Sequence, residues 1–99
     1  MEITEVNISL RHEDKLKGFV TITFDDRFVI RGLKIIQGTK GYFIAMPSRK
    51  RKDGLFVDIA HPITNDFRVE MEQIVLSKYW ELVERGEFGN PKPEMAFSV

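Results

Sequence analysis

The hydrophobic period changes once along this chain, and that change limits the possible folds more than any other feature. Before about residue 60, apolar residues alternate with polar ones, as in strands that bury one face. Residues 6–10 and 20–24 show this most clearly, and the second run is rich in β-branched residues. After His61-Pro62 the apolar spacing becomes helical. We therefore expect an α+β fold, in which an antiparallel sheet is followed by one C-terminal helix.

About five short strands are expected before the break. They cover residues 6–10, 20–24, 28–36, 42–46 and 55–60. Gly32 interrupts the third strand and indicates a bulge or a close backbone approach. Short connections, such as Asp25-Asp26 and the hairpin loop at 38–41, favour antiparallel neighbours. Residues 48–54 are expected to form a polar loop that ends in Asp53-Gly54, a strong turn signal.

The helix is expected from about residue 65 to 85. Thr64, Asn65 and Asp66 are all good N-cap residues, and Gly86 is suited to the position after the last turn. The helix carries two apolar stripes, the second formed by Val69, Leu76, Trp80 and Val83. A helix that is apolar on two sides is usually covered on two sides, and a small sheet covers only one. This predicts a homodimer, unless these residues are simply exposed or the tail covers them.

The length of 99 residues suits one domain, which we place at 1–86, with a tail at 87–99 that is loose or docks through Phe97. The chain has no cysteine, which excludes disulfides and thiol catalysis and favours a reducing compartment. It has no apolar run long enough to span a membrane and no signal-peptide pattern at its start. We expect a cytoplasmic protein with no membrane partner.

Evidence for catalysis or a bound cofactor is weak. The two histidines are His12 and His61, and only Asp58 and Ser48 lie near His61 as partners for a nucleophile–base pair. His61 is better explained as a corner residue that makes one hydrogen bond beside Pro62. Two distant histidines match no metal-ligand spacing, and the Gly-Thr-Lys at 38–40 precedes a strand rather than a helix, unlike a phosphate loop. We expect no enzyme activity, no metal, no cofactor and no small-molecule ligand.

Charge is unevenly distributed in the chain, although the formal net charge is +0. Residues 1–60 carry eleven Lys and Arg against eight acids, and residues 61–99 carry four against seven. Most of the difference comes from the basic run Arg49, Lys50, Arg51 and Lys52. Like charges this close repel each other, and phosphates of a nucleic acid would supply the missing counter-charge. The alternative is a solvated loop whose charges only aid solubility.

A block of residues around this basic run resembles the stage V sporulation protein G (SpoVG) family. The block consists of Ala45-Met46-Pro47-Ser48, the basic residues, Asp53-Gly54 and the segment from Asp58 to Ile63, Asp-Ile-Ala-His-Pro-Ile. The opening residues 1–6 and the strand at 41–44 are also similar, so the resemblance runs to about residue 80.

The resemblance implies a small bacterial regulator, not an enzyme, that forms homodimers from a β-sheet and a C-terminal helix. Family members bind DNA, some bind RNA, and they influence sporulation, septation, capsule or virulence gene expression. The family's nucleic-acid contact falls on Arg49 and Lys50, and a role in sequence preference falls on exposed helix positions such as Arg68 and Lys78. The chain departs from the family at Arg51-Lys52, which should strengthen phosphate attraction without sequence readout.

A second class of function is a protein–protein adaptor in septation or sporulation control, which would dock a partner on a sheet edge or on the apolar helix face without binding nucleic acid. The two classes differ in the surface that matters. A nucleic-acid-binding protein depends on the basic run, whereas an adaptor depends on residues such as Val69 and Trp80.

Overall fold

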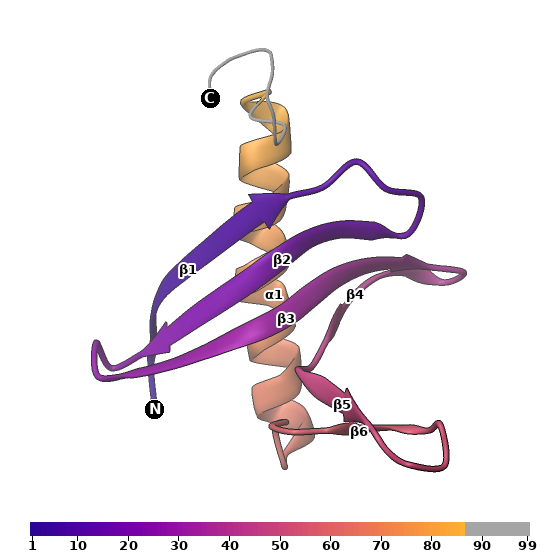
Figure 1. The fold of residues 1–99 in the computed structure, drawn as a ribbon. Helices are drawn as coiled ribbons and strands as arrows, with labels where there is room; N and C mark the ends of the chain where they lie inside the picture. The colour runs from indigo at the N-terminus through magenta and orange to yellow at the C-terminus, as the bar shows by residue number, and fades with distance from the viewer. Residues whose placement is uncertain (87–99) are drawn as a thin grey trace.

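The computed structural model describes residues 1–86 and shows a four-stranded main sheet backed by one helix (Figure 1). Four antiparallel strands lie in the order β1-β2-β3-β4, and they span Ile3–Leu10, Leu16–Phe24, Phe28–Gly38 and Gly41–Ala45. A separate antiparallel pair follows, β5 (Ser48–Lys50) with β6 (Phe56–Asp58), and then the helix α1 (Asn65–Glu84). The α+β order, the antiparallel pairing and the single late helix are confirmed. Within residues 1–86, no helix combines the length and the hydrophobicity that are needed to span a membrane.

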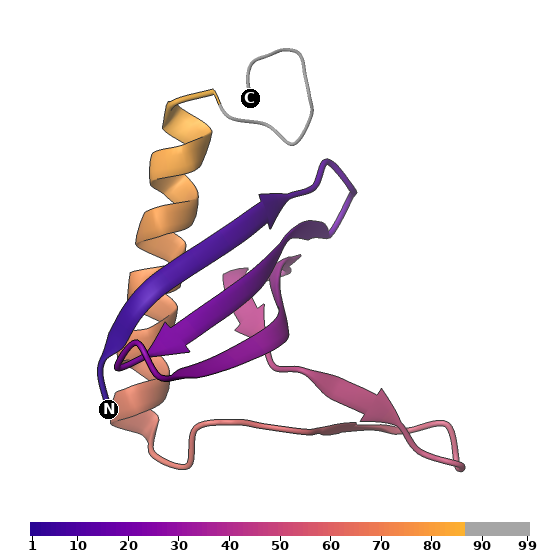
Figure 2. The same cartoon turned by 60° about the vertical axis from the view of Figure 1, so that its left-hand side comes forward.

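The core lies between the main sheet and α1, which face each other in the side view of Figure 2. Alternation along β2 sends Val20, Ile22 and Phe24 to the helix side, where all three are buried. The buried residues of the helix are Met71, Val75 and Tyr79, which are spaced four residues apart and therefore share one face. Burial of these two sets holds the helix against the sheet.

Gly32 forms a bulge in β3, in agreement with the sequence. The pairing of β2 with β3 shifts between Val20 and Ile22, and Gly32 adopts φ of +87°. Only glycine takes this left-handed conformation without strain. The bulge keeps Ile30 and Leu33 on the core side although three steps separate them, so the alternation survives on both sides of Gly32.

The helix α1 begins and ends at the residues that the sequence predicts. Thr64 is the N-cap, and its hydroxyl accepts a hydrogen bond from the amide of Phe67 at 3.2 Å. The C-cap is Arg85, and Gly86 follows with φ of +73°. The expected helix of 65–85 is therefore confirmed to within one residue.

Two expectations about the strands are wrong. Ser48–Lys50 is the strand β5, not part of a loop, so residues 1–86 contain six strands where about five were expected. The expected strand at 55–60 is only Phe56–Asp58, and it pairs with β5 instead of joining the main sheet. The reason is tertiary: the hairpin closed by Asp53-Gly54 lets a short polar segment pair with its neighbour although it has no apolar face of its own. The pair is here called the arm (residues 48–58), and it projects from the sheet (Figures 1 and 2).

The second apolar stripe of α1 is partly covered within the same chain. Leu76 and Val83 pack against the core. Trp80 lies against Tyr42 and Tyr79, with ring centroids 4.9 and 5.0 Å away, although 43% of the residue remains exposed. The stripe is thus less bare than the sequence suggests, and the homodimer stays a prediction. The expected tail at 87–99, with Phe97, lies outside the described residues.

Candidate nucleic-acid interface

The tip of the arm is a short turn that sets the basic residues away from the rest of the protein. The amide of Arg51 donates to the carbonyl of Leu55 at 2.7 Å, and the amide of Gly54 donates to the carbonyl of Arg51 at 3.1 Å. Gly54 has φ of +91°, the left-handed conformation that closes a three-residue hairpin loop. The Asp53 carboxylate also accepts from the Leu55 amide at 3.0 Å. The expected Asp-Gly turn is therefore present.

Strand geometry sends Arg49 and Lys50 to opposite faces of the arm. Arg49 pairs with Val57, and Lys50 pairs with Phe56. Successive residues of a strand point to opposite sides, and directly paired residues share a side. The arm is therefore a narrow ribbon with a cation on each face, followed by Arg51 and Lys52 at its tip. A loop would not have fixed these directions.

Most of the positive charge on the arm is unpaired within the described chain. All four basic residues are exposed. Arg51 Nη2 lies 3.1 Å from Asp53 Oδ2, and both side chains are about half exposed. Arg49, Lys50 and Lys52 form no ion pair with any residue among 1–86. Three of the four cations thus remain available for an external anion.

The two helix positions do not form one surface with the arm. Arg68 lies in the first turns of α1 and is half-buried, whereas Lys78 lies ten residues, about 15 Å, further along the axis. Lys78 Nζ is 3.9 Å from Glu81 Oε1 and lines a hollow beside β1. The arm leaves the molecule near the start of α1 (Figure 2), whereas Lys78 lies in the second half of this helix. Arg68 can therefore share a partner with the arm more easily than Lys78 can.

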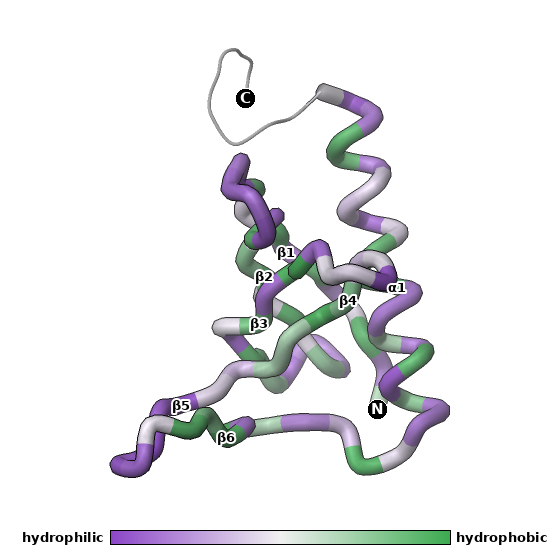
Figure 3. Tube along the Cα trace, turned by 90° about the vertical axis from the view of Figure 1, so that its right-hand side faces the viewer, coloured by the Kyte–Doolittle hydropathy of each residue, from purple (hydrophilic) through white to green (hydrophobic). Residues whose placement is uncertain are grey.

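Exposed apolar residues lie around β6 and in the segment that follows it. Leu55, Phe56, Ile59 and Ile63 are exposed by 62%, 68%, 64% and 91%. In Figure 3 the tip is hydrophilic, while β6 directly behind it is hydrophobic. Ile59 and Ile63, in the segment between the arm and α1, are here called the apolar base of the arm.

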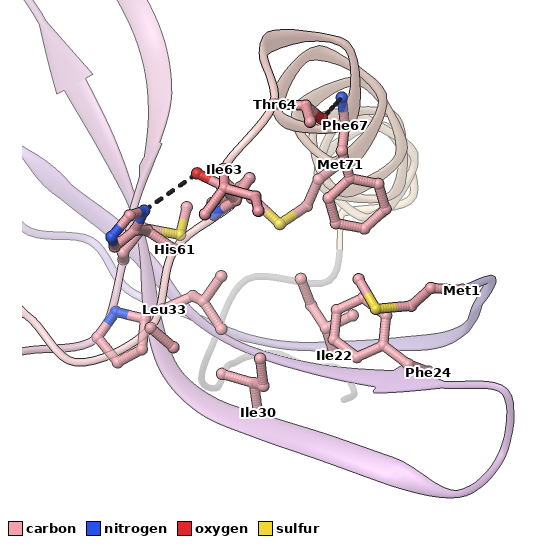
Figure 4. Close-up of a pocket in the computed structure, with 14 residues that line it drawn as sticks. Met1, Ile22, Phe24, Ile30, Leu33, His61, Ile63, Thr64, Phe67 and Met71 are labelled. Carbon is pink, nitrogen blue, oxygen red and sulfur yellow. Dashed lines mark hydrogen bonds between the residues drawn. The ribbon is translucent and has the colours of Figure 1, made fainter.

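A cavity of about 440 Å³ opens next to this apolar base (Figure 4). Ile22, Phe24 and Leu33 line it from the sheet, and Phe67 and Met71 line it from α1. Its two polar side chains are both engaged locally. The Thr64 hydroxyl caps the helix, and Nδ1 of His61 donates to the carbonyl of Pro62 at 3.0 Å. The cavity therefore offers apolar surface rather than a polar binding site.

His61 behaves as the sequence analysis favoured. It is exposed and makes one hydrogen bond, to its neighbour Pro62. No hydrogen bond within residues 1–86 joins it to Asp58 or Ser48, so the geometry of a nucleophile–base pair is not present. In the same residues no three His, Asp or Glu side chains lie close enough together to hold a metal.

The fold and the arm together define a small α+β domain that presents a cationic two-stranded ribbon. The family model described as SpoVG matches residues 1–81, which include every strand and most of α1. A protein of Anaeromyxobacter sp. (strain Fw109-5) named "Putative septation protein SpoVG" is 50% identical over 91 residues, covering 92% of this chain and 94% of that protein.

Two further relatives carry the same name. The protein of Anaeromyxobacter sp. (strain K) is 54% identical over 87% of this chain and 85% of its own length, and that of Myxococcus xanthus is 51% identical over 90% of each. The chain belongs to the SpoVG family, and the resemblance drawn from its sequence is confirmed.

Two features of the site were missed from the sequence. The strand character of Ser48–Lys50 is invisible to a periodicity argument, because Ser-Arg-Lys has no apolar residue to alternate. Its one signal was the turn at Asp53-Gly54, which requires a partner strand on each side. The cavity was missed because its walls come from the sheet, the loop after β6 and α1, which only the tertiary structure brings together.

Proposed function

We propose that this protein is a non-catalytic regulator that binds nucleic acid through the arm. The observation that supports it is the unpaired charge: three cations without an internal partner stand on a ribbon that projects from the domain. The major groove of B-DNA admits a two-stranded β-ribbon, and a ribbon inside a groove meets phosphates on both sides. Arg49 and Lys50, on opposite faces, suit that arrangement.

The roles of the four basic residues differ in this proposal. Arg49 and Lys50 contact phosphates on the two sides of the groove, and Arg adds bidentate hydrogen bonds. Lys52 adds a third phosphate contact at the tip. Arg51 mainly holds the turn through Asp53. Arg68 is a secondary contact near the base of the arm, and Lys78 is a weaker candidate because it lies at the far side of α1.

We also propose that the protein acts as a homodimer. The apolar base of the arm, with Ile63 exposed by 91% beside an apolar cavity, is more hydrophobic surface than a small monomer usually leaves bare. A second copy covering this region would also present a second arm. Two arms would then bring six unpaired cations to one duplex.

The first prediction concerns the salt dependence of binding. Six neutralised phosphates give a slope of log affinity against log salt of about −5 on duplex DNA, and a single arm gives about −3. Replacing Arg49 and Lys50 by alanine leaves one unpaired cation per arm, so the slope should fall to about −2. Fluorescence anisotropy with a labelled duplex over a range of salt concentrations measures both values.

The matched control is Arg27→Ala with Lys40→Ala, which removes two exposed cations from turns outside the arm. It lowers the net charge by the same amount and should leave the slope near the wild-type value. Equal losses in the two double variants would show that net charge, not the arm, attracts DNA. Absence of DNA binding by the wild type would overturn the proposal. Loss of function by Val69 or Trp80 substitutions, with normal function of the Arg49/Lys50 variant, would favour a protein–protein adaptor.

A further inference from the structure

The face of the main sheet opposite α1 is turned toward the viewer in Figure 1. It carries a second candidate binding surface, separate from the arm. An open hollow of about 300 Å³ lies on β1, β2 and β3. Asn7, Ser9, Phe19, Thr21 and Gly32 contribute to its lining. In the sheet register Asn7 pairs with Thr21 and Ser9 pairs with Phe19, so all four side chains stand on this one face.

The bulge at Gly32 borders this hollow. It lies opposite Thr21, where the pairing of β2 with β3 is shifted. Bulges often occur where a sheet receives a ligand. Phe19 gives the hollow an aromatic side, and its other sides carry the amide of Asn7 and the hydroxyls of Ser9 and Thr21. These groups suit a planar base with polar edges.

Cations stand around the aromatic wall. The guanidinium carbon of Arg11 lies over one face of the Phe19 ring, 5.0 Å from its centre, and Arg11 Nη1 donates to the Ser9 hydroxyl at 2.9 Å. Lys34 is the register partner of Phe19, so it stands on the same face, and it is exposed. Arg31, in the bulge, is also exposed. One carboxylate is close, that of Glu5, which accepts from Asn7 Nδ2 at 3.2 Å.

We infer that this hollow binds an unpaired base of single-stranded nucleic acid. The base stacks on the face of Phe19 that Arg11 does not cover, the polar side chains meet the edge of the base, and Lys34 and Arg31 hold the flanking phosphates. An aromatic ring among cations on an open surface is the common design of single-strand binding, because every base has a face on which to stack. A base inside a duplex cannot reach the hollow. The inference rests on the proposed function for its class of ligand, and it adds a second surface with a preference for single strands.

The test measures the affinity of each variant for a labelled single-stranded DNA of about 12 nucleotides and for the corresponding duplex. A single strand of this length spans about one binding site. Phe19→Leu keeps an apolar side chain but removes the ring, and it should weaken single-strand binding roughly tenfold. Lys34→Ala, at an exposed position, should weaken it several-fold through lost phosphate contact. Neither variant should alter binding of the duplex by as much as the Arg49/Lys50 double variant does.

The matched control is Phe28→Leu, which makes the same chemical change at a ring exposed by 64% at the start of β3. It should bind both probes as the wild type does. The inference is overturned if Phe19→Leu and Lys34→Ala, both folded by circular dichroism, retain wild-type affinity for the single strand.

The two proposals fail separately in this design. If the duplex needs the arm and the single strand ignores Phe19, the proposed function stands and the inference falls. If the single strand needs Phe19 and the duplex ignores the arm, the inference stands and the role of the arm falls. If the wild type binds neither probe, both are wrong.

Discussion

At the scale of single residues, Tyr79 shows how the packing of α1 on the sheet alters a side chain. Burial raises the pKa of the Tyr79 phenol above its usual value of 10.0, and the neighbouring Tyr42, through its charge and a hydrogen bond, raises it further. The two rings lie 5.7 Å apart, and Trp80 closes the cluster. Tyr79 is therefore held in its neutral form in the folded protein.

This pKa predicts a loss of stability in alkaline solution. The unfolded chain releases the Tyr79 proton near pH 10, while the folded protein still retains it, so stability is fully present below pH 10 and falls as the pH rises above it. Tyr79→Phe has no proton to release. Urea unfolding followed by Trp80 fluorescence should show a smaller drop between pH 9 and pH 11 for Tyr79→Phe than for the wild type. An equal drop in both proteins would contradict the prediction.

At the scale of elements, the arm depends on one glycine. Gly54 has φ of +91°, and a side chain in that conformation costs about 1–2 kcal/mol. The turn is exposed and separate from the core, so Gly54→Val should distort the arm and leave the thermal midpoint of the domain nearly unchanged. We expect DNA affinity to fall roughly tenfold, the equivalent of about 1.4 kcal/mol.

The control for that substitution is Gly54→Asn. Asparagine tolerates positive φ better than any β-branched residue, so this variant should keep most of the affinity. Anisotropy titrations and thermal unfolding of the three proteins provide the measurements. If Gly54→Val binds as tightly as the wild type, the shape of the arm has no part in binding, and only its charge matters.

At the scale of the whole molecule, the exposed apolar base of the arm predicts self-association. Ile63 is exposed by 91% in a single chain, so Ile63→Asp should change the stability of the monomer by no more than about 0.5 kcal/mol. Inside an interface the same carboxylate would be desolvated, and the dimer dissociation constant should rise at least roughly tenfold. Sedimentation velocity over a range of protein concentrations measures this.

Phe28→Asp is the matched control, since Phe28 is exposed by 64% but lies at the β2–β3 turn. It should sediment as the wild type does. A wild type that sediments as a monomer at all concentrations would show that no second copy covers the cavity. Dissociation by Phe28→Asp and not by Ile63→Asp would place the interface at the β2–β3 turn instead of at Ile63.

Local pattern and chemistry in the sequence determined the class of fold, the helix bounds, the bulge at Gly32, the family and the four clustered cations. Each of these depends on neighbours along the chain: alternation, spacing of three and four, a capping hydroxyl, or a run of charge. Thr64 caps the helix because its hydroxyl lies three residues before the amide it binds, and that relation is already present in the sequence.

Only the tertiary structure decided which surfaces those residues form. Pairing with β6 made a strand of Ser48–Lys50 and separated Arg49 from Lys50, and contact with Asp53 engaged Arg51. Packing against the sheet covered Leu76 and Val83, and register brought Asn7, Ser9 and Phe19 to one hollow. The physical reason is that periodicity tells which face of an element is buried but not which element covers it, because that choice is made by contacts between residues distant in the chain.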